Sequence, residues 1–118
     1  MYWVWPRLIV KMQDLRKGST ALLALHVLDE EPMYGFQLVE ALRARTGGVL
    51  DFAEGMLYPM LHKLERGGLL AAEWRPSVDG PPRKYYRLTP AGRDELARRR
   101  GDWVRFADAV DTALGTRR

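Results

Sequence analysis

Two extended runs of aromatic and aliphatic residues, 69–75 and 83–89, flank the turn-forming segment PSVDGPP. Such runs around a short Pro- and Gly-rich segment are typical of a β-hairpin, here with a stiff, exposed tip. Alternation predicts that the apolar side chains share one face: Leu70, Ala72, Trp74, Tyr86 and Leu88. The opposite face would present Arg75, Arg83, Tyr85 and Arg87.

Two helical segments are predicted first along the chain. Residues 19–28 are apolar almost all round, which indicates a buried helix that is capped by Ser19 and ends before Pro32. Residues 34–46 follow with a stripe of Leu and Val at helical spacing, and the Gly-Gly pair at 47–48 would end this helix.

A third helix is predicted to end at the second Gly-Gly pair, residues 67–68. Its start is ambiguous, because Asp51 and Glu54 form a D-x-x-E capping box whereas Pro59 is best tolerated in the first turn; we expect a start near Glu54 or Gly55. One side would be apolar: Met56, Leu57, Met60, Leu61 and Leu64. The other side carries Tyr58, Pro59, His62, Lys63 and Arg66.

A long last helix is predicted from Thr89-Pro90 to about Leu114, because a capping residue precedes a proline at the first helical position. Its apolar residues form one stripe: Leu96, Trp103, Phe106, Val110 and Leu114. No further element remains in the sequence to cover this stripe. We therefore expect a partner helix, most simply that of a second copy in a homodimer.

The order helix, helix, basic helix, hairpin, helix is that of a winged helix-turn-helix, whose third helix enters the major groove of DNA while the hairpin wing reaches the backbone. The expected fold class is mainly α with a small β-hairpin wing and a long C-terminal dimerisation helix. Residues 14–89 would form the DNA-binding domain and residues 90–118 the dimerisation helix and tail. Residues 1–13, which begin MYWVWPRLIVK, would be an N-terminal arm or an upstream extension.

Nineteen Lys and Arg against fifteen Asp and Glu give a net charge of +4, which favours a polyanionic partner if the cations cluster. The cations expected at phosphates are Lys17, Lys63, Arg66, Arg75, Arg83, Lys84 and Arg87, with Arg16 as an addition. Tyr58 and His62, beside Pro59, would face base edges. The alternatives are that Tyr58 packs on the wing and that His62 is simply solvated.

The sequence offers little for catalysis or for metal binding. Without cysteine there is no thiolate nucleophile, disulfide or Cys-based zinc site, and a cytoplasmic location is natural. His26 and His62 are the only histidines, and their spacing is not that of a metal site. We expect His26 in the core or at an interface. No apolar run is long enough to span a bilayer. We expect that the protein is not an enzyme, needs no cofactor, binds no metal and has no membrane partner.

Three stretches resemble the PadR family of transcriptional regulators: LRKGSTALLALHVLDEEPMYGFQLVEAL at Leu15–Leu42, GMLYPMLHKLERGGLL at Gly55–Leu70 and PPRKYYRLTPAGRDEL at Pro81–Leu96. The resemblance extends from Asp14 to Leu114, and its LYP and YY-x-LT motifs are specific in this order. It implies a prokaryotic regulator, usually a repressor, that binds a palindromic operator as a dimer through its C-terminal helix. With one helix after the wing, the chain is similar to the short-tailed subgroup.

The same resemblance implies that Tyr58 and the wing residues Arg83 and Lys84 meet DNA, while Tyr86 and Leu88 are core residues. Ala53 departs from the pattern, because the family often has a small hydroxyl residue there. Some members bind flat aromatic molecules between tryptophans of paired C-terminal helices, which implies an effector site at Trp103 and Phe106. The alternative is that both rings simply fill the dimer interface.

A winged helix that binds protein or RNA without reading a DNA sequence is the alternative function, because a fold does not fix a function. The charges argue against it. A protein-binding winged helix tends to lose the cations of the third helix and the wing, and this sequence keeps them.

Overall fold

A computed structural model describes residues 18–49 and 54–116, and the structural statements below concern these residues. The predictions for residues 1–13, Arg16, Lys17, Asp51 and Ala53 lie outside the described residues. A first helix covers residues 18–30 of the described chain. The elements that follow are β1 (Met33–Tyr34), α2 (Gly35–Arg45), α3 (Glu54–Arg66), β2 (Leu70–Ser77), β3 (Gly80–Leu88) and α4 (Pro90–Leu114). The fold is mainly α with one small sheet, as predicted.

The helix boundaries follow the predicted caps with two exceptions. Gly47 and Gly48 have φ of 61° and 78°, a left-handed conformation that ends the turn after α2 as expected. Ser19 is not an N-cap, because the chain is already helical at Gly18. α3 does begin at Glu54, but Pro59 is then its sixth residue and lies in the second turn rather than the first.

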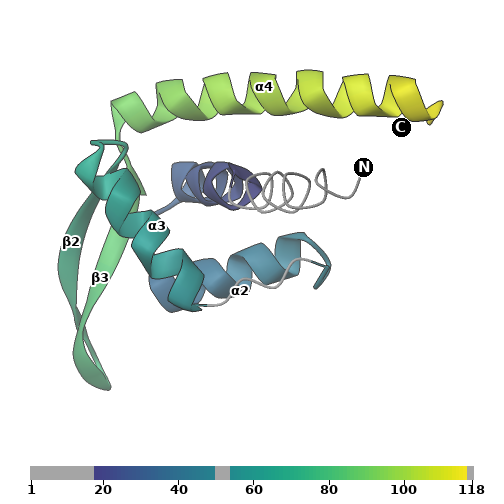
Figure 1. Cartoon of the computed structure of the whole chain (residues 1–118). Helices are drawn as coiled ribbons and strands as arrows, with labels where there is room; N and C mark the ends of the chain where they lie inside the picture. Colours follow the sequence, from purple (N-terminus) through teal and green to yellow (C-terminus); the bar gives the residue numbers. More distant parts are fainter. Residues whose placement is uncertain (1–17, 50–53, 117–118) are drawn as a thin grey trace, which may run out of the picture.

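The hairpin is longer than the sequence predicted, because strand pairing continues through the proline-rich segment and leaves only Val78 and Asp79 as the turn. Leu70 pairs with Leu88, Ala72 with Tyr86 and Trp74 with Lys84, so the predicted apolar face is confirmed. The register shifts between Arg75 and Ser77. Figure 1 shows both strands projecting well past the helices, away from α4.

A third strand was not predicted. Met33 and Tyr34 form β1, which pairs antiparallel with Tyr86 and Tyr85 and gives the sheet order β1-β3-β2. The sequence analysis had placed Tyr34 in the second helix. A two-residue strand has no periodicity of its own, and its pairing with β3 depends on residues about fifty positions away.

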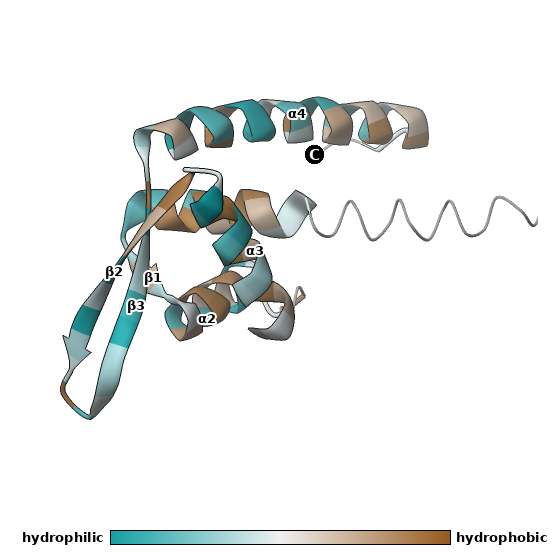
Figure 2. Ribbon diagram, turned by 60° about the vertical axis from the view of Figure 1, so that its left-hand side comes forward, coloured by the Kyte–Doolittle hydropathy of each residue, from teal (hydrophilic) through white to brown (hydrophobic). Residues whose placement is uncertain are grey.

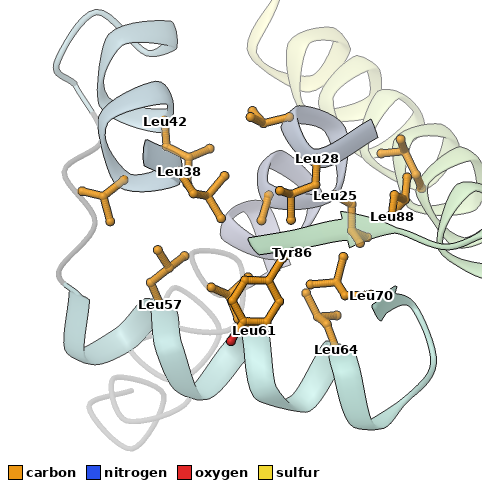
Figure 3. Close-up of a cluster of buried hydrophobic side chains, with 14 residues drawn as sticks. Leu25, Leu28, Leu38, Leu42, Leu57, Leu61, Leu64, Leu70, Tyr86 and Leu88 are labelled. Carbon is orange, nitrogen blue, oxygen red and sulfur yellow. The ribbon is translucent and has the colours of Figure 1, made fainter. Parts of the chain in front are cut away.

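One leucine-rich core holds the first helix, α2, α3, the sheet and the start of α4 together (Figure 3). Leu25, Leu38, Leu57 and Leu61 are at most 1% exposed. Leu96 also belongs to this core and is 4% exposed. The expectation that Leu96 forms part of an uncovered stripe is therefore wrong, because the first turns of α4 pack on their own chain.

Beyond Leu96, α4 leaves the core and runs past the other helices (Figure 1). Figure 2 colours the same helix by the hydropathy of its residues. The remaining residues of the predicted stripe are all exposed in the single chain: Trp103, Phe106, Val110 and Leu114. Trp103 and Phe106 lie side by side, with ring centroids 5.9 Å apart. The distal half of α4 thus presents an apolar surface.

Candidate nucleic-acid interface

Helix α3 has one face in the core and the other in water, because leucines recur at helical spacing along one side. Leu57, Leu61 and Leu64 are buried. The residues predicted for the other side are all exposed: Tyr58, Pro59, His62, Lys63 and Arg66. α3 therefore offers a continuous surface with two cations at its C-terminal end.

Tyr58 lies directly against the start of α2. A Cβ atom built on Gly35 would come within 2.6 Å of the Tyr58 Cε1 atom and closer still to its hydroxyl oxygen. Only a glycine at position 35 leaves room for the ring in this position. Sequence analysis missed Gly35, which has an ordinary negative φ and so carries no turn signature.

Two wing arginines stack on tyrosine rings. The Cζ atom of Arg75 lies 4.3 Å from the Tyr85 ring centroid, and that of Arg83 lies 4.6 Å from the Tyr34 centroid. The two rings meet edge to face with centroids 5.3 Å apart. Cation–π contacts of this kind restrict where the guanidinium groups lie. Tyr34 was missed by sequence analysis because β1 was missed.

The same arginines each have a carboxylate neighbour. Arg75 donates to Glu73 at 2.7 Å, and Arg83 lies 3.5 Å from Asp79 in the hairpin turn. A hydrogen bond from Ser77, followed by the backbone of Asp79 and the charge of Arg83, lowers the pKa of the Asp79 carboxyl. These groups are exposed, so a phosphate can replace the carboxylates at little cost.

Lys84 lies on the other face of β3, opposite Trp74, and its Nζ atom donates to Glu65 of α3 at 3.0 Å. This hydrogen bond is the main cause that raises the pKa of Lys84. Lys84 therefore stays charged and ties the wing to α3. Arg87, by contrast, is exposed on the face that carries Arg75 and Arg83.

A notch of about 370 Å³ lies between the start of α2, α3 and the wing. We call it the wing notch. Its lining residues are Tyr34, Gly35, Tyr58, His62, Trp74, Arg83, Lys84 and Tyr86. It brings together four residues that the sequence predicted at DNA, namely Tyr58, His62, Arg83 and Lys84, whereas Lys63, Arg66, Arg75 and Arg87 lie outside it.

Comparison with known proteins identifies the family. The family model described as the transcriptional regulator PadR-like family matches residues 24–98, from the first helix to the early turns of α4. This chain belongs to the PadR-like family. It is thus a transcriptional regulator with a DNA-binding winged helix, and the family is not one of enzymes.

Individual relatives agree with this PadR-like assignment. The transcriptional regulator Rv3488 of Mycobacterium tuberculosis is 40% identical over 85 residues, which cover 72% of this chain and 76% of that protein. A PadR family regulator from Eggerthella lenta is 35% identical, covers 98% of this chain and 99% of its own, and has a TM-score of 0.75. A PadR-like regulator from Bacillus cereus is 26% identical, with coverages of 88% and 99% and a TM-score of 0.74.

The described part of this PadR-like chain offers little for metal binding or for crossing a membrane. No group of three or more His, Asp or Glu side chains is placed there to hold a metal ion. None of the helices described is long and apolar enough to cross a membrane. His26 is half-exposed between two helices, where its Nδ1 atom lies 2.7 Å from Arg100 and its Nε2 atom 3.5 Å from Glu30.

Proposed function

We propose that this PadR-like regulator binds a palindromic DNA operator in the cytoplasm as a homodimer and represses transcription from it. One observation carries the proposal: Tyr58 and His62 from the exposed face of α3 line the same notch as the wing cations Arg83 and Lys84. α3 would enter the major groove while the wing contacts the flanking backbone.

Each predicted residue has a role in this proposal. Tyr58, Pro59 and His62 would meet base edges and the adjoining backbone. The cations would neutralise phosphates: Lys17, Lys63, Arg66, Arg75, Arg83, Lys84 and Arg87. Each phosphate contact should contribute a slope of about −0.9 to the dependence of log K on log salt concentration.

The dimer would form through the distal half of α4. Trp103, Phe106, Val110 and Leu114 would pack against the same residues of a second copy, because an isologous interface uses one surface twice. Leu96 is excluded from this set by its burial in the core. The boundary between DNA-binding and dimerisation regions, expected at residue 90, would then fall within α4, after Leu96.

Trp103 and Phe106 would also provide an aromatic site for a small effector that releases DNA. In a dimer each ring pair would face its symmetry mate, which forms a flat apolar slot. A planar aromatic dye should then quench Trp103 emission and weaken operator binding. If the dye does neither at a saturating dimer concentration, the rings only fill the interface.

Selection of the protein against a random duplex library, at near-physiological salt, tests the main proposal. We expect an enriched palindrome with half-sites about 10 base pairs apart. Arg66→Ala should weaken binding of this duplex about tenfold by fluorescence anisotropy, because it removes a phosphate contact. Arg98→Ala removes the same charge from α4 and should bind like the wild type.

The alternative function predicts a different result. A winged helix that serves as a protein or RNA module would enrich no duplex sequence, and Arg66→Ala and Arg98→Ala would have equal, small effects on weak binding. Competition with an RNA of equal length distinguishes the two polyanions. RNA that displaces the duplex at equal concentration would contradict the proposal.

A further inference from the structure

The wing notch contains a large side chain to which the proposed function gives no role, the indole of Trp74. Trp74 is 68% exposed, although it shares its sheet face with Ala72 and the buried Tyr86. The hairpin formed by β2 and β3 extends beyond the helices (Figure 1), and the indole is mostly in water. Its exposed apolar surface is available to an occupant of the notch.

The charges of the notch indicate what such an occupant would be. Arg83 and Lys84 bring two cations, Tyr58 and His62 bring polar groups, and none of its lining residues is acidic. The occupant should therefore carry a negative charge beside an apolar part that packs on an aromatic ring. A sugar–phosphate unit has both parts.

The position of the notch indicates the source of this unit. The notch separates α3 from the wing, and the proposed function places these elements in the major groove and on the flanking backbone. A duplex strand that passes from one to the other must cross the notch. We propose that the wing notch holds one sugar–phosphate unit of the operator backbone, with the deoxyribose against the Trp74 indole and the phosphate on Arg83 and Lys84.

This inference rests on the proposed function and adds Trp74 to its binding residues. The geometry of the notch supports it in a second way. The Tyr58 ring on Gly35 closes one wall, and the cation–π contact that places the Arg83 Cζ atom 4.6 Å from the Tyr34 ring centroid restricts the guanidinium at another. The notch is thus formed before DNA arrives, which reduces the entropy lost on binding.

Affinity for the selected duplex gives the first test. Trp74→Leu should weaken binding about tenfold, because it removes the ring that covers the sugar. Trp74→Phe keeps a ring and should stay within about threefold of the wild type. The thermal midpoints of both variants should match that of the wild type, since the indole is mostly exposed. Equal affinity of Trp74→Leu and wild type would overturn the inference.

Fluorescence gives a second, direct test. Replacing Trp3, Trp5 and Trp103 by Phe leaves Trp74 as the only tryptophan of the chain. Addition of the operator duplex should shift its emission to shorter wavelength and protect it from quenching by acrylamide. An indole that stays as accessible to acrylamide in the saturated complex as in the free protein would contradict the proposal.

Neutral methylphosphonate linkages, placed one at a time along the operator, identify the phosphate. One linkage in each half-site should weaken wild-type binding and cost much less in Lys84→Ala, where the contact is already lost. Additive losses at every linkage would overturn the assignment. If the wild type binds no duplex at all, the proposed function fails too; if Arg66→Ala loses affinity while Trp74→Leu does not, only the notch inference fails.

Discussion

At the scale of single residues, Gly35 determines where the Tyr58 ring lies. A methyl group at this position would overlap the ring, as the 2.6 Å approach to Cε1 shows. The ring would have to rotate out of the notch or push α2 and α3 apart. The proposed DNA surface therefore depends on a residue that has no side chain to contact DNA.

Gly35→Ala should consequently lower operator affinity by about tenfold and the free energy of unfolding by about 1–3 kcal/mol, since overpacking strains its neighbours. Anisotropy and urea denaturation measure the two quantities. Gly101→Ala is the matched control, because a Cβ there would meet only the end of Arg105 at 3.5 Å. A Gly35→Ala protein with wild-type affinity would show that the position of the Tyr58 ring is unimportant.

The ion pair between Lys84 and Glu65 leads to a second prediction. Glu65 competes with phosphate for the lysine, so Glu65→Gln should tighten operator binding about threefold. It should also steepen the salt dependence, because the lysine then becomes fully available to phosphate. Glu40→Gln, which breaks the ion pair with Arg43 on α2, removes the same charge away from the notch and serves as control. Weaker binding by Glu65→Gln would indicate that Glu65 holds Lys84 in place for DNA.

The residues of the site differ in how far the sequence could predict them. The exposed face of α3 followed from leucine spacing, so His62, Lys63 and Arg66 lie where expected. Trp74 was placed on the correct face, but alternation does not show where a core ends along a strand. Gly35 and Tyr34 depend on contacts with distant elements, and no local pattern marks such contacts.

At the scale of elements, α4 is attached to the sheet through its first turn. The Thr89 hydroxyl accepts a hydrogen bond from Gly92 N at 3.0 Å and lies 2.7 Å and 3.0 Å from the carbonyl oxygens of Gly68 and Leu69. The sequence predicted this cap because a Thr followed by a Pro marks the start of a helix, whatever the rest of the chain does. It did not predict that Leu96 is buried, because that depends on where α4 crosses the core.

Thr89→Ala should lower the free energy of unfolding by about 1–2 kcal/mol, because it removes both the helix cap and a link to the loop before β2. Chemical denaturation measures this change. Thr112→Ala is a suitable comparison, since the Thr112 hydroxyl donates only to Asp108 O, one turn earlier on the exposed part of α4. Equal losses from the two variants would refute a special role for Thr89.

Glu95 should make the stability of the chain sensitive to acid. Hydrogen bonds from Arg98 and Arg99 lower the pKa of its carboxyl from 4.5 to about 2. A lowered pKa in the folded state stabilises the protein above the ordinary value, and this contribution is lost as the pH falls towards 2. Wild type should therefore exceed Glu95→Gln in stability at neutral pH and match it near pH 2. A difference that stays constant over this range would contradict the prediction.

At the scale of the whole molecule, one helix serves two purposes. The first turns of α4 complete the core through Leu96, and its distal turns present Trp103, Phe106, Val110 and Leu114 to water. The two ends of the stripe looked alike in the sequence, because helical spacing is the same in both. Only the placement of the other helices distinguishes a buried turn from an exposed one.

Phe106→Glu should convert the proposed dimer into monomers, because it places charges in the centre of the apolar stripe. Sedimentation velocity measures the change, and operator binding should weaken because each monomer reaches only one half-site. Thr112→Glu adds the same charge on the opposite face of α4 and should remain dimeric. A Phe106→Glu protein that sediments as the wild type does would mean that the stripe is not the interface.

The close packing of Gly92 has a mechanical consequence. A Cβ on Gly92 would collide with the Leu69 carbonyl and come within 2.5 Å of Leu88 Cδ1, so the direction in which α4 leaves the sheet is set by direct contact. From Pro90 to Leu114 the helix rises about 36 Å, which makes it a lever arm. A tilt of about 5° at this pivot would move the far end by about 3 Å. Small changes beside Gly92 would thus alter the distance between the two α3 helices of a dimer.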